Sequence, residues 1–289
     1  MRLPAAAIML LGCISAWAQT PVAQSDLSVP SKIAPAYFGP NAFPVPEIPE
    51  ARIPGGITAE LAGEFALGQG QAQDLTYGPS FKLTLPLWTD RAALTVWMPI
   101  VEWWRYDAQT AAMRRLQPQY LGGGSGHDSG DVYVSTDLHL LKADGRLPDI
   151  MVRAVLKTAS GNHYGEARYY DAPGYFFDAT VAKSLYFNGF IKEFRAAASS
   201  GFLCWQTDNG RQNDAVQAGI SAMADGGRFR FEAQAAGYLG WENDGDRPIT
   251  VRARLDYHTG TLSPFFSVAY GLHDYPFVHF RLGVKYPLK

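Results

Sequence analysis

Apolar and polar residues alternate along most of this chain, from Ile57 to its C-terminal end. Between residues 57 and 68, isoleucine, leucine and phenylalanine stand at odd-numbered positions, and threonine and glutamate stand at even-numbered ones. Near the end, Val278 and Phe280 alternate in the same way with His279 and Arg281. A period of two places each class of residue on its own face of a β-strand. No segment keeps a helical period, so the chain is predicted to be all-β.

The alternating segments are long for strands of a soluble protein. Most span about 11–14 residues, whereas strands of soluble proteins average about 5–6 and a tilted strand that crosses a bilayer needs about 9–11. Their length predicts a single antiparallel transmembrane β-barrel over residues 57–289, with about twelve strands. The predicted strands are 57–68, 76–88, 93–106, 131–143, 149–160, 175–187, 194–207, 214–225, 228–241, 248–258, 263–272 and 277–288.

The connections between these segments alternate in length. Asp225-Gly226-Gly227-Arg228 fits a two-residue hairpin turn, because glycine permits positive φ. Residues 107–130 and 161–174 form much longer connections. Short turns on one side and long loops on the other are typical of outer-membrane barrels, in which the turns face the periplasm. An even number of strands then places both termini of the barrel in the periplasm.

Aromatic residues gather near the ends of the predicted strands. Rings of this kind suit the headgroup zones of a membrane and often form two girdles around a barrel. We expect the loop-end girdle to contain Trp103, Trp104, Tyr106, Tyr175, Trp205, Trp241 and Tyr275, and the turn-end girdle to contain Trp88, Tyr186, Phe187, Tyr257 and Tyr286.

Composition agrees with this interpretation. Hydrophobic residues make up 47% of the chain and charged residues 18%, with a formal net charge of -2. The absence of a basic excess argues against nucleic-acid binding. No apolar run reaches the roughly 18–20 residues that a membrane-spanning helix needs. The hydrophobicity is spread over alternate positions instead.

The N-terminal 56 residues differ from the rest. Arg2, the apolar run that follows it and Ala16-Trp17-Ala18 predict a signal peptide over residues 1–18 and export to the outer membrane. Leu10-Leu11-Gly12-Cys13 leaves open a lipoprotein alternative. Residues 19–56 are rich in proline, which predicts an extended segment. This segment could lie in the periplasm or enter the barrel as a plug.

The polar face of the strands carries many charges, and it should line the lumen, because an arginine or lysine facing lipid would cost about 2–4 kcal/mol at mid-depth. Across one hairpin we expect Arg230 to lie near Asp256, and Glu232 near Arg254. Such a ladder could be a structural network that fills the bore, or a cationic constriction that selects solutes. The candidate lumen-lining residues are Asp137, His139, Arg153, Lys157, Arg228, Arg230, Glu232, Arg252, Arg254, Asp256 and Arg281.

The sequence offers no convincing catalytic, cofactor or metal site. Nucleotide-binding, zinc-ligand and nucleophile-elbow motifs are missing. The glycine-rich run 122–130 has no helix after it, which favours a flexible loop over a phosphate cradle. Ser135, Asp137 and His139 share one strand face, but neighbours on such a face stand about 6.6–7 Å apart, too far for a catalytic triad.

Three stretches resemble uncharacterised outer-membrane β-barrel proteins of Gram-negative bacteria. They are Arg146-Leu147-Pro148-Asp149, residues 152–162 and residues 170–178. The chain is also similar in outline to barrel transporters grouped with phenol-degradation proteins. The resemblance covers about 57–288 and implies a barrel in outer-membrane lipid, without assigned catalytic residues. The chain departs from the usual barrel ending, because its last residues, Pro287-Leu288-Lys289, lack a terminal aromatic residue.

These observations favour a passive channel for a small polar or anionic solute. The alternative is a closed structural or accessory barrel that binds an envelope partner through its surface loops. A barrel enzyme is the least favoured, and the chain is predicted not to be an enzyme.

Overall fold

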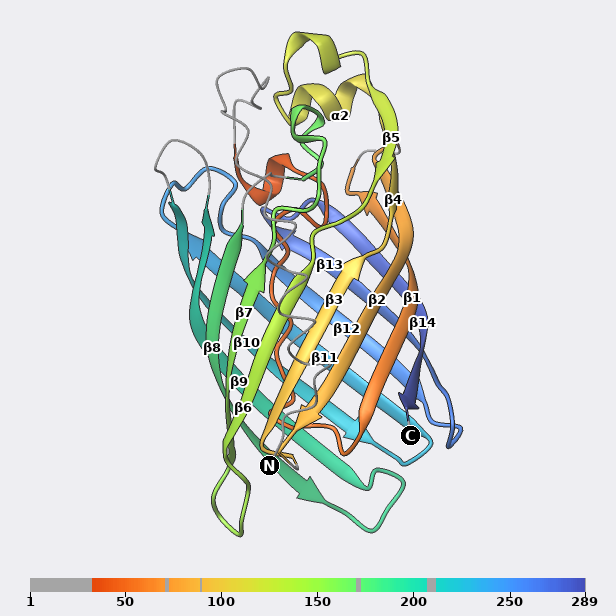
Figure 1. The fold of residues 1–289 in the computed structure, drawn as a ribbon, viewed down its shortest axis with the longest axis vertical. Coiled ribbons are helices and arrows are strands. Elements are labelled where there is room, and N and C mark those ends of the chain that lie inside the picture. The colour runs from red at the N-terminus through yellow and green to blue at the C-terminus, as the bar shows by residue number, and fades with distance from the viewer. Residues whose placement is uncertain (1–32, 71–72, 89, 170–172, 207–211, 289) are drawn as a thin grey trace, which may run out of the picture.

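A closed antiparallel sheet forms the body of the molecule (Figure 1). The computed structural model describes residues 33–70, 73–88, 90–169, 173–206 and 212–288. Strand β1 (Ile57–Gly68) pairs with β2 (Leu75–Leu87) on one side and with β14 (Phe277–Leu288) on the other, which closes the barrel. The other strands are β3 (Ala92–Pro99), β4 (Glu102–Tyr106), β5 (Gly124–Asp128), β6 (Tyr133–Leu141), β7 (Asp149–Lys157), β8 (Gly174–Tyr186), β9 (Glu193–Gln206), β10 (Gln212–Asp225), β11 (Phe229–Gly240), β12 (Ile249–Tyr257) and β13 (Ser263–His273).

Two of the barrel strands are each divided into two segments. Strands β3 and β4 both pair with β2 and are separated only by residues 100–101. Strand β6 pairs with β3, and β5 continues this line by pairing with β4. The barrel therefore has twelve strands, and the predicted all-β transmembrane architecture is confirmed.

The prediction of a flexible glycine-rich loop over 122–130 was wrong for its central part. Residues 124–128 form β5, in register with residues 102–106 of β4. Gly126 lies against the indole of Trp104, where an added Cβ would come within 2.6 Å of the ring. The glycine is needed for this close packing, so the sequence feature that indicated a loop is a requirement of the sheet.

The two ends of the barrel differ, as the connection lengths predicted. One end carries the longer connections, including the short helix α2 (Ala108–Met113) (Figure 1). The other end carries short turns, the start of β1 and the end of β14. We call these the loop end and the turn end. In the part of the chain that the structure describes, no helix is both long enough and apolar enough to span a membrane.

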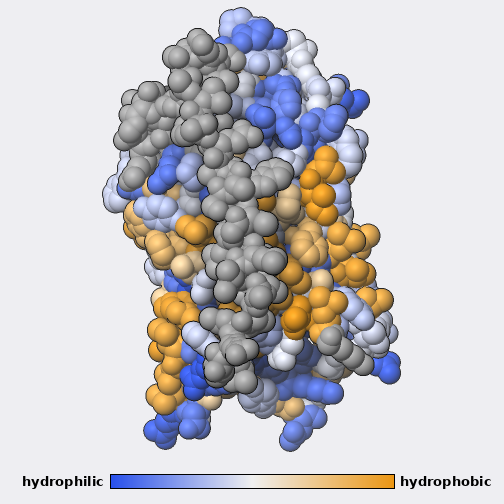
Figure 2. All heavy atoms as spheres, viewed as in Figure 1, coloured by the Kyte–Doolittle hydropathy of each residue, from blue (hydrophilic) through white to orange (hydrophobic). Residues whose placement is uncertain are grey.

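The outer surface of the barrel is apolar at the positions that the alternation predicted. Leu61, Leu156, Ile220, Leu239 and Leu282 point outward and are more than half exposed. Figure 2 shows apolar residues over the middle of one face and hydrophilic residues at both ends. A band of this kind is what lipid contact requires.

The predicted signal peptide over residues 1–18, its lipoprotein alternative and residues 19–32 of the proline-rich region lie outside the described residues. Residues 33–56, called the N-terminal segment below, are described and contain a single short 3-10 turn at Pro35–Tyr37. Proline at 35, 40, 44, 46, 49 and 54 accounts for the lack of regular structure, because proline offers no N–H and fixes φ.

Candidate functional site

The N-terminal segment runs through the bore of the barrel from the loop end to the turn end (Figure 1). At the loop end, Ala36 N donates to the carbonyl oxygen of Gly245 (3.2 Å) and Gly39 N donates to that of Ala167 (2.8 Å). At the turn end, Arg52 pairs with Glu193, the first residue of β9. The bore is therefore occupied by the chain's own residues.

The half of the bore near the loop end is lined by aromatic side chains. Phe43 packs against Phe38 and Trp205, with ring centroids 5.2 and 6.0 Å apart. Tyr238 donates to the carbonyl oxygen of Phe43 (3.3 Å) and accepts from Trp205 Nε1 (3.3 Å). This half of the bore is thus an apolar core around the segment, with a few polar anchors.

This packing corrects the predicted loop-end girdle. Trp104, Tyr106, Trp205 and Tyr275 are buried rather than directed at lipid. Trp104 and Tyr106 follow Glu102 at intervals of two, so all three share the inward face of β4. Trp103, one position out of step, is exposed, as are Trp241 and the turn-end residues Trp88, Tyr186, Phe187, Tyr257 and Tyr286.

A buried charge cluster holds the loops over the segment. Arg114, which follows α2, donates to Asp74 Oδ2 (2.5 Å), and Arg168 Nη1 lies 3.9 Å from Asp74 Oδ1. Both guanidinium groups are almost fully buried. The pKa of the Arg114 guanidinium is lowered to about 10, because the effect of burial is larger than the opposite effect of the nearby Asp74 carboxylate. The cluster joins the β1–β2, β4–β5 and β7–β8 connections at the loop end.

The half of the bore near the turn end is lined by charged side chains that bind the main chain of the segment. Arg153 Nη2 donates to the carbonyl oxygen of Glu47 (2.9 Å), and Arg195 Nε donates to that of Glu50 (2.8 Å). Arg252 donates to the carbonyl oxygen of Val45 and lies 3.5 Å from that of Pro46. The bore therefore supplies donors to a run of peptide carbonyls.

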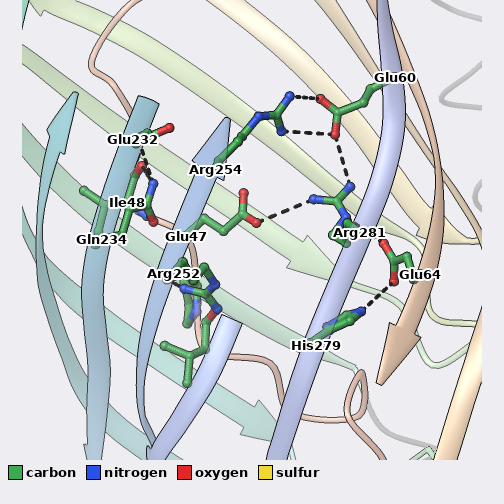
Figure 3. Close-up of polar contacts among 12 residues, drawn as sticks. Glu47, Ile48, Glu60, Glu64, Glu232, Gln234, Arg252, Arg254, His279 and Arg281 are labelled. Atoms are coloured by element: carbon green, nitrogen blue, oxygen red, sulfur yellow. Dashed lines mark hydrogen bonds and ion pairs between the residues drawn. The ribbon is translucent and has the colours of Figure 1, made fainter. Parts of the chain in front are cut away.

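Carboxylates of the segment and of the wall share the same arginines (Figure 3). Arg281 lies 3.7 Å from Glu47 of the segment, and 3.1 and 3.0 Å from Glu60 and Glu64 of β1. Arg254 lies 3.0 Å from Glu60 and stacks over the ring of Phe265, with its Cζ 3.8 Å from the centroid. One network thus connects the segment to the barrel wall.

The structure places most of the predicted lumen residues on the inner face, with partners. Asp137 lies opposite Arg153, which pairs with Asp178 (2.6 Å), and His139 Nε2 lies 3.0 Å from Asp149. Lys157 is buried 2.6 Å from Asp131. Arg230, Glu232, Arg252, Arg254, Asp256 and Arg281 lie along β11, β12 and β14 beside the segment.

Arg228 differs from this expectation. It precedes β11 and is exposed in the turn between β10 and β11, where Gly226 N donates to the carbonyl oxygen of Phe229 (2.9 Å). Gly227, with φ of 88°, and Arg228 are the two residues of this turn. The hairpin turn expected at residues 226–227 lies one residue further along, so Arg228 belongs to the turn and not to the lumen.

The predicted cross-strand ladder has the expected register and different side-chain partners. Arg230 stands opposite Asp256, and Glu232 opposite Arg254. Arg254, however, binds Asp256 two residues along its own strand (2.8 Å), and Arg230 turns to Glu50 of the segment. Glu232 accepts from Gln234 (2.9 Å). The segment inside the bore thus supplies the partner of Arg230 in place of Asp256.

Several residues of the site were not among the sequence candidates. Gln234 has no charge, and the carbonyls of the segment carry no side-chain signal. The carboxylates of Glu47 and Glu50 stand three positions apart between prolines, a spacing that could have indicated a bound extended segment. Asp149, at the start of β7, pairs with both His139 and Arg195, and the cluster of Asp74, Arg114 and Arg168 joins residues distant in sequence.

The side chains that the sequence offered for catalysis lie in the packed wall of the barrel. His139 is paired with Asp149, and Ser135, which lies in β6 with His139, is buried. Within the described ranges, no three His, Cys, Asp or Glu side chains gather closely enough to hold a metal ion. Cys204 is buried and is not in a disulfide.

The fold is shared with solved outer-membrane proteins. The NanC porin superposes with a TM-score of 0.53 at 11% sequence identity, over 80% of this chain and 100% of that one. An outer membrane channel from Pseudomonas putida F1 superposes with a TM-score of 0.55 at 11% identity, over 86% of this chain and 97% of that one. No protein-family model and no curated protein matches the chain. The chain has the fold of an outer-membrane β-barrel.

Proposed function

We propose that this protein is an outer-membrane channel for a small polar or anionic solute, without enzymatic activity, and that its N-terminal segment holds the bore closed. The observation that carries the proposal is the occupation of a charged bore by a segment whose carbonyls are bound by arginines of the wall. Arginines on an inner face attract anions, and low-dielectric walls strengthen that attraction.

The charge pattern of the wall supports an anionic solute. Among the described residues, Arg252 binds only carbonyls of the segment. Arg230 pairs with Glu50 of the segment, and its Nη2 lies 3.9 Å from Glu232 of the wall. Departure of the segment would leave these two guanidinium groups facing water. A solute carboxylate or phosphate could then replace the lost acceptors, since guanidinium forms strong hydrogen bonds with such groups.

The contacts of the segment near the turn end suit reversible closure. The side chains of Glu47, Glu50 and Arg52 are 50%, 31% and 35% exposed. Water therefore reaches these ion pairs, and exposed pairs contribute about 0–1 kcal/mol each. Near the turn end, the segment is therefore held by several modest contacts, so this part could leave the bore without unfolding the barrel.

A closed accessory barrel that binds an envelope partner through its loops is the second candidate. The observation in its favour is the buried cluster of Asp74, Arg114 and Arg168, which holds three loop-end connections together above the segment. Such a rigid loop end could present a fixed surface.

Conductance in planar bilayers distinguishes the two. We expect brief, rare openings for the full chain, and sustained conductance with anion selectivity for a variant lacking residues 33–52. Reversal potentials in a salt gradient give the selectivity, which should weaken for Arg230→Ala and Arg254→Ala. A variant that folds as a barrel, judged by circular dichroism, and conducts no ions would contradict the channel and favour the accessory barrel.

A further inference from the structure

The bore recognises the main chain of the N-terminal segment at nearly every residue between 43 and 51. Gln234 binds both main-chain groups of Ile48, accepting from its N (3.0 Å) and donating to its O (3.1 Å) (Figure 3). Arg195 reaches the carbonyl oxygens of both Glu50 and Ala51. Contacts to main-chain groups do not depend on the side chains of the bound peptide, so they tolerate other sequences.

The contacts match a peptide that is rich in proline. The wall supplies mainly donors, from Arg153, Arg195 and Arg252, and the segment supplies carbonyl acceptors. Proline lacks an N–H but keeps its carbonyl, so it loses nothing at such a site. It also limits the unbound peptide to extended conformations, which reduces the entropy lost on binding.

Two carboxylates add a charge requirement. Glu47 faces Arg281 and Glu50 pairs with Arg230. In an extended proline-rich chain, residues three apart lie about 9 Å apart along the axis, on the same side. The two arginines therefore select acidic groups at a fixed separation.

Three of the arginines that contact the segment also have partners within the wall. Arg153 pairs with Asp178 (2.6 Å), Arg195 with Asp149 (2.8 Å) and Arg281 with Glu60 (3.1 Å), and all of these partners are wall residues. These pairs would hold the donors in place after the segment leaves. A preformed site binds a second ligand at lower cost than one that must order itself.

We infer that the turn-end half of the bore is a peptide-binding site, which accepts from another polypeptide an extended, proline-containing stretch with two carboxylates three residues apart. The inference rests on the proposed function, because the site becomes available only when the N-terminal segment leaves. The bound peptide would then close the channel in place of the chain's own residues.

The test uses the full chain, folded before it is cut. A recognition sequence for a site-specific protease is inserted between Gly55 and Gly56, which are exposed beside β1. An added Cβ at Gly55 meets no atom within 4 Å, so the site has room. After cutting, binding of a fluorescent peptide of residues 40–54 is followed by anisotropy in detergent, which does not require the barrel to conduct.

The competitors separate the possible results. One peptide keeps the three prolines at 44, 46 and 49 and both glutamates, and has alanine elsewhere. We expect it to displace the probe, and its version with both glutamates changed to glutamine to bind about tenfold more weakly, because two partly exposed ion pairs are lost. The inference would be overturned if only the native sequence displaced the probe, or if the glutamine version bound as tightly as the glutamate version. It would also be overturned if the probe did not exchange with the segment in the cut protein.

Variants of the wall provide the matched control. Arg252→Gln should weaken binding of the alanine-substituted peptide. Lys183→Gln should leave it unchanged, because Lys183 also donates to carbonyls, those of Gly145 (2.6 Å) and Leu147 (2.7 Å), but at the turn end outside the bore. An equal effect of both changes would contradict the site. Peptide binding without conductance in the cut protein would refute the channel and leave the site standing.

Discussion

The side-chain amide of Gln234 binds Ile48 at both of its main-chain groups, with N to Oε1 at 3.0 Å and Nε2 to O at 3.1 Å. This pair joins β11 to the middle of the N-terminal segment. The wall thereby accepts the main-chain N–H of Ile48 as well as donating to its carbonyl oxygen, which fixes the position of the segment along the axis. The strength of closure should therefore depend on this amide.

Replacing the amide should open the channel. Gln234→Leu removes both bonds, and we expect a loss of about 2 kcal/mol in segment binding, which raises the open population about thirtyfold. Single-channel recordings measure the open probability. Gln217→Leu is the matched control, because Gln217 is a lumen residue whose amide binds the carbonyl oxygen of Phe177 in the wall (3.2 Å). Equal open probabilities for the two variants would exclude this role for Gln234.

The shared arginine network predicts different effects for two glutamates. Glu60 is buried in the wall between Arg254 and Arg281, so Glu60→Gln should destabilise the barrel by about 3 kcal/mol. Glu47 is half exposed on the segment, so Glu47→Gln should lower the free energy of unfolding by less than about 1 kcal/mol. Urea unfolding in lipid vesicles, followed by tryptophan fluorescence, measures both. A larger loss for Glu47→Gln would mean that the segment, and not the wall, holds the barrel together.

Gly39 should be intolerant of a side chain. An added Cβ at this position would lie 2.8 Å from the carbonyl oxygen of Arg168 and 3.0 Å from its Nη2. Gly39→Ala should therefore displace the loop end of the segment, at a cost of about 1–3 kcal/mol, and make channel openings more frequent. Gly55→Ala, where nothing lies within 4 Å, should behave as the unchanged protein. Unaltered gating in both would show that the contact with Arg168 can relax.

The start of α2 should respond to acid. Asp107 accepts from the N and Oγ1 of Thr110, both at 2.8 Å, and these bonds hold the pKa of Asp107 below its ordinary value. Because the folded pKa is lowered, the stabilisation is complete above the ordinary value and is lost as the pH falls through the folded one. Hydrogen exchange of residues 108–114, corrected for intrinsic rates, should rise over this acidic window.

A neutral cap should remove the acid response. Asparagine is as good an N-cap as aspartate, so Asp107→Asn should keep protection of residues 108–114 at neutral pH and hold it on acidification. An Asp107→Asn variant that loses protection over the same acidic range would assign the effect to another group.

The strands could be predicted because their two faces meet different solvents. Lipid on one side and polar contacts on the other impose a period of two, and the hairpin register follows from the centre of the turn, as Arg230 opposite Asp256 shows. The alternation does not predict which side chains fill the bore. Trp104 and Tyr106 have the inward parity of Glu102, but aromatic type suggested a lipid girdle.

The occupant of the bore was hidden from sequence for a physical reason. Arg153, Arg195 and Arg252 find their acceptors among peptide carbonyls, which every residue carries. Proline density predicts an extended chain but does not place it. The actual partner of Arg230 is Glu50, 180 positions earlier in the chain, and no local pattern connects the two.

The continuity of the segment with β1 has a kinetic consequence. Residues 53–56 join the bound stretch directly to Ile57, so a released segment stays within reach of its site. A short connection gives an effective concentration on the order of millimolar. A competing peptide must exceed that level, or arrive while the segment is displaced, to occupy the bore. The length of this connection, more than the strength of any one contact, would then set how long the barrel stays open.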